Sequence, residues 1–381
     1  REMTSRRATA GVSETERKYR MGKKVVVGMS GGVDSSVAAY LLKEQGYEVI
    51  GVTMQIWQSE TKCEVEKKGG CCGISAVEDA RRVAEVLDIP YYVMNFRAEF
   101  KRDVIDYFVR EYRLGRTPNP CIACNRFVKW EALLQRSLLL GADYIATGHY
   151  AQVLCLENGR YALGLSKTAA KDQTYALYNL TQRQLSHTLM PIGAYEKPEV
   201  RAIAAAAGLP VAAKPDSQEI CFVPDGDYAR FIDESTGEPS APGNFVDTAG
   251  QVLGQHRGIT HYTVGQRKGL GIAFGEPRYV TALRPETNEV VLGTGEEVFS
   301  SKLLADDVNW MAVSQPEVGT KFRCRAKIRY NHGGADCEVL MLPDGKIQVM
   351  FPTPQRAVTP GQAVVLYTEA GIVLGGGTIE R

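Results

Sequence analysis

The sequence predicts an α/β protein in which a doubly wound parallel sheet is followed by a small, mostly β module and a C-terminal β-barrel. Hydrophobic runs and amphipathic helical segments alternate over residues 24–150, which is the rhythm of a parallel sheet with helical crossovers. After about residue 216, Gly and Pro become frequent and helical periodicity disappears. Short β-like runs then follow between residues 321 and 380, as in a small barrel.

Length and charge limit the classes of protein to consider. The chain has 381 residues, enough for two or three domains of about 100–200 residues. Its formal net charge is +1, so nucleic-acid binding would need a local basic patch. No apolar run approaches the roughly 20 residues that span a bilayer, and no signal-peptide pattern is present. We therefore expect a cytoplasmic protein whose nine cysteines are reduced, reactive or metal-bound.

The α/β part begins with four strands and four helices in alternation. A capping-box pattern, Ser75 with Glu78 three residues later, predicts the start of the second helix. The next segment predicts a hairpin after residue 151 and helices near 172–186 and 197–207. The four strands are expected at residues 23–29, 47–54, 91–96 and 143–150, and the four helices at 33–46, 75–88, 99–115 and 125–141.

Changes in amino-acid composition and in hydrophobic periodicity along the chain suggest the domain boundaries. Residues 1–22 are polar and aperiodic and are expected to form a disordered tail. The α/β domain then covers 23–225, a small β linking domain 226–292 and the barrel 293–381. Residues 58–73, which are charged and Gly-rich, predict a long loop within the α/β domain.

The stretch GMSGGVDSS, residues 28–36, joins the first strand to the first helix. Gly31 and Gly32 let the backbone approach a ligand, and the amides at the start of the helix can bind an anion. Asp34 beside phosphates is suited to help hold Mg²⁺. A plain glycine turn with ordinary caps is the alternative, but the strand–SGGxDS–helix order favours a nucleotide site.

A second motif, TPNPCIACN at residues 117–125, places two thiols in a proline-stiffened loop. Cys124 comes just before a helix that is expected to begin near Asn125, where the helix dipole would help its thiol to ionise. A structural zinc site would need a second CxxC or two histidines, and the chain has no second CxxC. The alternative is that both cysteines are small buried hydrophobic residues.

The other cysteines give weaker signals. Cys221 lies in the apolar run ICFV, which taken alone is typical of a core position. Cys155, Cys324 and Cys337 fall on apolar phases of predicted strands and are expected in cores. For Cys71 and Cys72, sulfur relay, metal binding and a plain loop all stay open.

A basic strand is predicted near the C-terminus. In RCRAKIRY, residues 323–330, four basic residues share one face by the two-residue period, and Tyr330 takes the opposite, core face. These charges indicate either a stripe that follows RNA phosphates or an ordinary solvated face.

Together, SGGVDS, TPNPCIACN and DSQEICF resemble the motifs of one family, the bacterial-type tRNA-uridine 2-sulfurtransferases of the PP-loop ATP pyrophosphatase superfamily. The resemblance runs from about residue 23 to 381. It includes ATGHY (146–150), KDQTY (171–175), HYTVGQRKGLGI (261–272), KIRY (327–330) and TPGQ (359–362).

The resemblance implies a role for specific residues. The implied ATP contacts are Gly28, Met29, Ser30, Gly31, Gly32, Val33, Asp34, Ser35, Met54 and Gly148. Asn119, Pro120 and Cys121 would lie against the target base. The implied tRNA contacts are His149, Lys171, Asp172, Gln173, Arg329, Tyr330 and Gln362. Cys124 would be the nucleophile, and Cys221 would carry a persulfide.

The implied reaction is ATP-dependent 2-thiolation of the wobble uridine of tRNA. ATP with Mg²⁺ would adenylate the uracil 2-oxygen, and sulfur would pass through Cys221 and Cys124 with a disulfide left behind. Many family members have Asp where this chain has Cys121, so a [4Fe–4S] cluster on Cys121, Cys124 and Cys221 is an open alternative, with zinc as a third.

The implied partners are tRNA and a sulfur-donor protein, either a persulfide carrier or a cysteine desulfurase. We expect no membrane association and a monomer when free. Two alternative hypotheses are an amide-forming PP-loop ligase and, in another class, a non-catalytic RNA-binding module that a bound metal stabilises. The intact SGGVDS loop argues against the second.

Overall fold

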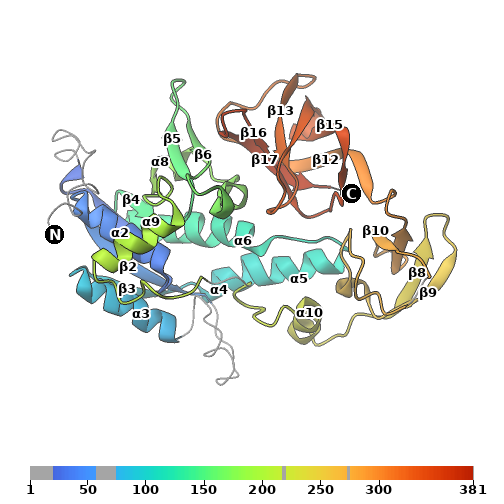
Figure 1. The fold of residues 1–381 in the computed structure, drawn as a ribbon, viewed down its shortest axis with the longest axis horizontal. Coiled ribbons are helices and arrows are strands. Elements are labelled where there is room, and N and C mark those ends of the chain that lie inside the picture. The colour runs from blue at the N-terminus through green and yellow to red at the C-terminus, as the bar shows by residue number, and fades with distance from the viewer. Residues whose placement is uncertain (1–19, 57–73, 217–219, 273–274, 381) are drawn as a thin grey trace. The chain divides into compact units, whose positions relative to one another are not determined.

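The computed structural model describes residues 20–56, 74–216, 220–272 and 275–380 (Figure 1). The chain forms two compact units. The sheet unit comprises Arg1–Lys101, Cys124–Thr174 and Leu180–Pro224. The barrel unit comprises Arg102–Ala123, Tyr175–Asn179 and Asp225–Arg381. The expected tail, apart from residues 20–22, and the predicted loop 58–73 lie outside the described residues.

The sheet unit contains a five-stranded parallel sheet with the order β3-β2-β1-β4-β7. The chain order reverses between β1 and β4, which makes the carboxyl ends of these two strands the topological switch point where ligands bind in such folds. This confirms the predicted sheet. Its strands are β1 (Lys24–Gly28), β2 (Glu48–Gln55), β3 (Tyr91–Asn95), β4 (Tyr144–Ala146) and β7 (Thr188–Leu189).

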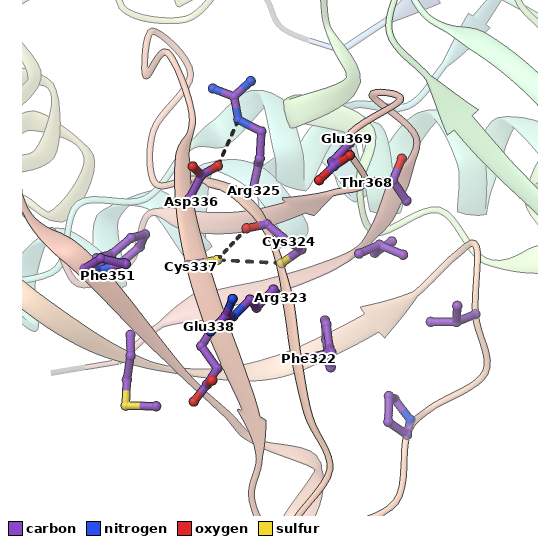
Figure 2. Close-up of a pocket in the computed structure, with 15 residues that line it drawn as sticks. Phe322, Arg323, Cys324, Arg325, Asp336, Cys337, Glu338, Phe351, Thr368 and Glu369 are labelled. Carbon is purple, nitrogen blue, oxygen red and sulfur yellow. Dashed lines mark hydrogen bonds and ion pairs between the residues drawn. The ribbon is translucent and has the colours of Figure 1, made fainter.

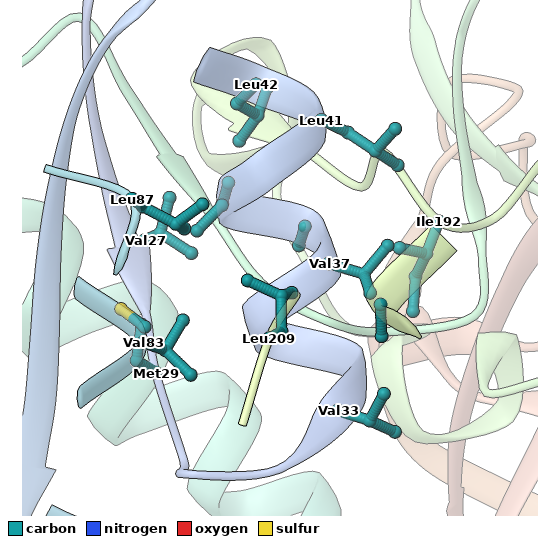
Figure 3. Packing of buried hydrophobic residues seen from close by; sticks show 14 of the residues in the cluster. Val27, Met29, Val33, Val37, Leu41, Leu42, Val83, Leu87, Ile192 and Leu209 are labelled. Carbon is teal, nitrogen blue, oxygen red and sulfur yellow. The ribbon is translucent and has the colours of Figure 1, made fainter. Parts of the chain in front are cut away.

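Helices cover the sheet through an apolar cluster. The helices α2 (Val33–Glu44), α3 (Ile74–Val86) and α9 (Lys197–Ala206) contribute to it, and α2 and α9 lie side by side in Figure 1. Figure 3 shows Val27 of β1 among side chains from these elements. Val25 and Val27 face this cluster, whereas Gly28 faces Leu133 on the other side of the sheet.

The remaining elements of this part of the chain are short. A π-helical stretch is uncommon and widens the helix by one residue per turn. Among the described residues, two such stretches occur: η2 (Lys101–Ile105) between α4 (Arg97–Phe100) and α5 (Asp106–Arg113), and η3 (Cys124–Leu133) between α6 (Pro120–Ala123) and α7 (Leu134–Leu139). The others are β5 (Gln152–Cys155), β6 (Tyr161–Gly164), η4 (Ala169–Lys171), η5 (Thr174–Leu177) and α8 (Gln182–Ser186).

The barrel unit contains the small β module and the C-terminal barrel. The module is a four-stranded sheet, β10-β11-β8-β9, and the barrel closes in the order β12-β15-β14-β13-β16-β17. Both confirm the predicted class. The module consists of α10 (Tyr228–Thr236), β8 (Gly243–Asp247), β9 (Val252–His256), η6 (Ile259–His261), β10 (Tyr279–Arg284) and β11 (Glu289–Gly293). The barrel consists of β12 (Phe299–Trp310), β13 (Lys321–Lys327), β14 (Ala335–Met341), η7 (Pro343–Gly345), β15 (Ile347–Arg356), β16 (Ala363–Tyr367) and β17 (Val373–Ile379).

Several predicted elements differ from the structure. The prediction missed β12, whose burial does not alternate cleanly and whose pairing with β17 shifts register between Asp306 and Asn309. The helix predicted near 172–186 is two short helices, because Thr181 starts α8 with a capping box of its own. The predicted N-cap Ser75 lies inside the first turn, since α3 begins at Ile74.

No helix in the described part of the chain is long and apolar enough to cross a membrane.

Candidate functional site

The glycine-rich loop, residues 28–36, leaves β1 at the switch point and enters α2. Gly31 has φ +68°, and a Cβ on it would lie 2.3 Å from the carbonyl oxygen of Ala76. Only glycine fits this position. Gly32 is the N-cap of α2 and offers no side-chain bond to the first-turn amides. These amides therefore provide an anion-binding helix start.

Two hydroxyls fix the shape of this loop. Ser35 Oγ accepts a hydrogen bond from the Ser30 amide at 3.2 Å and donates to the Gly32 carbonyl at 3.3 Å. Ser36 Oγ donates to the same carbonyl at 2.8 Å. These hydrogen bonds constrain the conformation of the loop.

Gly148 follows β4 and lies directly against the start of α2. A Cβ at Gly148 would come within 2.5 Å of the Ser35 amide nitrogen. On the other side, the Thr53 hydroxyl of β2 donates to the Met29 carbonyl at 2.8 Å, and Met54 is the next residue of that strand. The structure therefore brings the predicted ATP residues of β1, α2, β2 and the β4 exit to one end of the sheet.

The Asp34 carboxylate is held by two groups that sequence reasoning missed. Lys197 Nζ, at the start of α9, lies 2.7 and 2.8 Å from its two oxygens. The Tyr150 hydroxyl donates to Asp34 at 2.7 Å. Burial, together with this hydrogen bond, raises the pKa of Tyr150, so the phenol stays neutral and donates. The sequence contains only an indirect signal for Lys197. The glycine-rich loop has no lysine, so an anionic ligand there would need a cation from another segment of the chain.

Asp216 joins the same cluster of charges. Lys197 Nζ lies 2.8 Å from its carboxylate, Lys171 Nζ 2.9 Å and the Arg201 guanidinium 3.0 Å. Burial alone would raise the pKa of Asp216, but the hydrogen bonds from Lys197 and Lys171 outweigh it and lower the pKa. Asp216 therefore stays ionised. We call Asp34, Lys197, Asp216, Lys171 and Arg201 the charge cluster.

Lys214 is a second lysine that reaches the loop. Its ammonium donates to the Gly31 carbonyl at 2.9 Å and to Asp79 at 2.7 Å. Lys197 and Lys214 both come from the segment that includes α9 and the residues after it. This segment supplies the positive charge that the loop itself lacks.

Three predicted tRNA contacts are bonded within the protein. His149 is 9 % exposed, and its Nδ1 lies 2.7 Å from the Thr147 hydroxyl. Burial and then the Lys129 ammonium hold the pKa of His149 well below its usual value, so the ring is neutral. Asp172 accepts bonds from the Ser166 and Thr174 amides. Gln173 Oε1 accepts from the Tyr150 amide at 2.8 Å.

The cysteine loop differs from the prediction at its helix start. The helical run begins at Pro120, so Cys121, and not Cys124, lies in the first turn. Asn119 caps this start, because its Oδ1 accepts from the Cys121 amide at 3.0 Å and the Ile122 amide at 3.4 Å. Asn is a good N-cap and Pro is favoured at the first helical position. The dipole argument made for Cys124 therefore applies to Cys121, which is exposed.

Cys221 lies at a turn and is followed by two buried residues, Phe222 and Val223. Phe222 is buried and its ring lies edge-on to Phe100 at 5.7 Å. The Val223 amide closes the turn on the Ile220 carbonyl at 3.0 Å. Cys221 itself is half-buried, as is Cys124, so neither has the environment of a core residue.

Within residues 20–56, 74–216, 220–272 and 275–380, no group of three or more His, Cys, Asp or Glu side chains is placed to hold a metal ion. Cys121 belongs to the barrel unit, and Cys124 and Cys221 belong to the sheet unit. The metal on these three thiols therefore stays a prediction.

The TPGQ segment, residues 359–362, packs on the start of the cysteine loop within the barrel unit. Gln362 Nε2 donates to the Thr117 carbonyl at 2.7 Å, and the Thr117 amide donates to the Pro360 carbonyl at 2.8 Å. A Cβ on Gly361 would lie 2.9 Å from the Thr117 nitrogen. The sequence resemblance assigned Gln362 to tRNA, whereas here it fixes the loop that carries Asn119 and Cys121.

The predicted basic strand is changed in two ways. Arg329 and Tyr330 follow the end of β13 in a bend, and Tyr330 is 40 % exposed, so it is not a core residue. Acidic residues of β14 lie opposite the arginines of β13, with Arg325 3.7 Å from Asp336. The stripe is therefore of mixed charge.

A cavity of about 1080 Å³ opens on the barrel (Figure 2). Its lining pairs Arg323 and Arg325 with Asp336, Glu338 and Glu369, a balance that does not suit a phosphate site. In Figure 2 the thiols of Cys324 and Cys337 face each other across two strands, with their Sγ atoms 3.6 Å apart. Both are buried, as predicted.

The last cysteine predictions have different outcomes. Cys155, expected in a core, is exposed at the end of β5, and that prediction was wrong. Cys71 and Cys72 lie outside the described residues.

Three family descriptions match successive parts of the chain. They are the tRNA methyl transferase HUP domain at residues 23–225, the tRNA methyl transferase PRC-barrel domain at 229–294 and the aminomethyltransferase beta-barrel domain at 300–379.

Curated relatives match nearly the whole chain. The tRNA-specific 2-thiouridylase MnmA of Lachnoclostridium phytofermentans is 68% identical over 94% of this chain and 99% of that protein. The tRNA-specific 2-thiouridylase MnmA 1 of Thermoanaerobacter pseudethanolicus is 58% identical over 95% of this chain and 99% of its own length. The tRNA-specific 2-thiouridylase MnmA of Clostridium perfringens is 56% identical over 94% of this chain and 98% of that protein.

A solved 4-thiouridine synthetase–RNA complex with bound ATP aligns with a TM-score of 0.33 at 20% identity. The alignment covers 53% of this chain and 45% of that one. This likeness is too low to carry an argument.

Proposed function

Because the chain belongs to the tRNA-specific 2-thiouridylase family, we propose that it catalyses the ATP-dependent 2-thiolation of uridine in tRNA, at the wobble position. The observation that carries this proposal is the glycine-rich loop at the β1–β4 switch point, in a unit that also contains Cys124 and Cys221. ATP is its proposed ligand, and the contacts are the residues assigned above to the loop, Met54 and Gly148.

The first chemical step is adenylation of the base. The uracil 2-oxygen attacks the α-phosphorus of ATP, and pyrophosphate leaves. The first-turn amides of α2 bind phosphate oxygens, and Gly31 and Gly32 let the backbone come close. Mg²⁺, when bound, would neutralise phosphate charge, and Asp34, in the first turn of α2, would help to hold it together with phosphates and water.

The second step is sulfur transfer. The terminal sulfur of a persulfide on Cys221 attacks C2 of the base, the C2–O bond breaks and AMP leaves. The Cys124 thiolate then attacks Cys221 Sγ, which breaks the sulfur–sulfur bond to the base and leaves 2-thiouridine. The resulting Cys124–Cys221 disulfide is reduced with two electrons from an external dithiol. This route assigns no step to a metal cluster.

Recognition of tRNA is assigned to several parts of the chain. Asn119, Pro120 and Cys121 would meet the target base after it leaves its stack. Lys171, Arg329 and the exposed Tyr330 would contact the tRNA, and residues 293–381 would form a tRNA-binding barrel. His149, Asp172, Gln173 and Gln362 would act by holding these loops in place. A sulfur-donor protein is the remaining partner.

The proposal is tested by incubating the protein with unmodified tRNA, Mg·ATP and a persulfide source, and measuring 2-thiouridine by nucleoside mass spectrometry. Cys221→Ser should bind ATP and tRNA as the wild type does but form no 2-thiouridine. Cys155→Ser, which changes an exposed thiol outside the proposed site, is the matched control and should retain activity. Full thiolation by Cys221→Ser would contradict the assignment. Wild-type protein that binds RNA without ATP–pyrophosphate exchange would instead indicate a non-catalytic RNA-binding module.

A further inference from the structure

The segment between η6 and β10 contains a short loop, residues 263–269, that we call the basic loop. Two adjacent cations, Arg267 and Lys268, are exposed in it. Three other arginines of the small β module are paired with carboxylates: Arg230 with Asp225, Arg278 with Glu276 and Arg284 with Glu289. Among the described residues, no ion pair engages Arg267 or Lys268. Their charge is therefore available to a ligand.

Hydrogen bonds fix the backbone of the basic loop. The Gln266 amide donates to the Thr263 carbonyl at 3.0 Å, and Gln266 Oε1 accepts from the Thr263 amide at 3.0 Å. Gln266 Nε2 donates to the Lys268 carbonyl at 3.0 Å. Gly265 and Gln266 also pair with Val280 of β10, at 2.7 and 2.9 Å. The two cations thus extend from a backbone that is tied to the sheet of the module.

Two further arginines of the barrel unit lie beside the basic loop. A Cβ on Gly265 would lie 2.5 Å from Ala357 Cβ, so the loop packs on the end of β15. Arg356, the preceding residue, is exposed, and its guanidinium lies 5.2 Å from the centroid of the Tyr279 ring. The Arg329 guanidinium donates to the Arg356 carbonyl at 2.9 Å. In the part of the chain that the structure describes, no ion pair engages either arginine. This face therefore differs from β13, whose arginines lie opposite the carboxylates of β14.

The basic loop also contacts the segment that leads to the proposed target-base residues. The Thr117 hydroxyl donates to the Thr263 hydroxyl at 3.4 Å, and Asn119 follows Thr117 by two residues. Since a chain spans at most about 3.6 Å per residue, Arg267, four residues after Thr263, lies within about 14 Å of it. The basic loop is thus close enough to reach phosphates next to a base held at Asn119.

We propose that Arg267 and Lys268 bind phosphates of the tRNA nucleotides that flank the target uridine, and that Arg356 extends this site. This inference rests on the proposed function, because it takes tRNA as the ligand. Cations that bind phosphates release counterions from the RNA, and this release favours association. Phosphate contacts carry no sequence information but fix the register of the nucleic acid on the protein. The basic loop thus holds the strand while the target base leaves its stack.

The test measures the dissociation constant of the whole chain for unmodified tRNA at several salt concentrations, without ATP. One phosphate contact to a single strand contributes about 0.7 to the slope of log affinity against log salt, which corresponds to about fivefold in affinity at about 0.1 M salt. Arg267→Gln/Lys268→Gln should therefore bind tRNA about 25-fold more weakly than wild type, with a slope that is less steep by about 1.4. The anticodon stem–loop alone should show the same loss, because it contains the flanking phosphates.

The matched control is Arg284→Gln, which removes another exposed cation of the module, one that lies 3.2 Å from Glu289. It should keep the affinity and the salt dependence of wild type. Arg267→Lys preserves the charge and should lose no more than about twofold in affinity, since lysine also binds phosphate as a point charge. At saturating tRNA, the thiolation rate of the double variant should equal that of wild type, because a contact made equally before and during the reaction changes KM and not kcat.

Wild-type affinity for tRNA in a folded Arg267→Gln/Lys268→Gln protein would overturn the proposal. Unchanged tRNA affinity with a loss of thiolation only when a protein supplies the persulfide would assign the loop to an acidic protein partner instead. A loss for whole tRNA but not for the stem–loop would overturn the assignment to the flanking phosphates. Wild-type protein that binds no tRNA would refute the proposed function itself. Should the double variant fail to fold, Arg267→Gln and Lys268→Gln decide singly, each with a loss of about fivefold.

Discussion

The close approach of Gly148 to the start of α2 gives a prediction whose size follows from the structure. In Gly148→Ala, the new Cβ would lie 2.5 Å from the Ser35 nitrogen and 2.6 Å from the Asp34 carbonyl carbon. Both distances are about 1 Å shorter than van der Waals contact, and both atoms belong to the backbone. The β4 exit and the first turn of α2 must therefore separate by about that amount.

The expected cost has two parts. Overpacking of this kind destabilises a folded protein by about 1–3 kcal/mol, which thermal or urea unfolding measures. A displacement of about 1 Å in a positioning element can lower the rate of catalysis by about 100-fold, so tRNA-dependent ATP–pyrophosphate exchange should fall by roughly that factor. ATP affinity, from equilibrium titration, should fall as well.

The matched control is Gly333→Ala, because a Cβ on Gly333 meets nothing within 4 Å. Its free energy of unfolding and its rate of ATP–pyrophosphate exchange should equal those of wild type. Wild-type exchange activity in Gly148→Ala would refute the reasoning, since the start of α2 would then not need its position to bind ATP.

Two further predictions concern titration and thiol reactivity. Folded His149 stays neutral because burial lowers its pKa. Below about pH 6.5 the unfolded chain therefore binds one proton more than the folded protein. For each pH unit that the pH is lowered there, this residue decreases the free energy of unfolding by about 1.4 kcal/mol. Between about pH 6.5 and pH 5, the free energy of unfolding measured in urea should fall less for His149→Asn than for wild type. The same pH dependence in both proteins would contradict the burial of a neutral ring. In the folded protein, iodoacetamide should modify Cys155 rapidly and Cys324 and Cys337 only on unfolding, because a mutual hydrogen bond and burial raise the pKa of Cys324. Peptide mass spectrometry checks this, and rapid labelling of native Cys324 would show that the barrel opens.

Local signals in the sequence predicted the parts of the site that depend on neighbouring residues. The glycine-rich loop was recognisable because its glycines and the following helix are contiguous, and the alternation of strands and helices predicted a doubly wound parallel sheet. The position of the switch point between β1 and β4 comes from the structure. The helix start at Pro120 is also encoded locally, since Asn119 and Pro120 are a cap and a first-turn residue. The apolar pattern after Asn125 instead predicts a start near Asn125.

The remaining parts depend on contacts between distant segments. The bond from Lys197 to Asp34 joins residues 163 positions apart, and nothing in the KPEV stretch around Lys197 marks it as part of an ATP site. The pairing of Gln362 with Thr117 spans 245 positions. Strand β12 escaped prediction because its burial does not alternate and its place is set by two partner strands, β15 and β17.

The central claim is that ATP activates the 2-oxygen of the target uridine before sulfur replaces it. The most direct test uses tRNA whose target uridine carries ¹⁸O at C2, with mass spectrometry of the AMP released during thiolation. The account predicts that the ¹⁸O appears in AMP, one label for each 2-thiouridine formed, because the C2–O bond breaks while the oxygen is bonded to the α-phosphorus. Unlabelled AMP together with full formation of 2-thiouridine would contradict it.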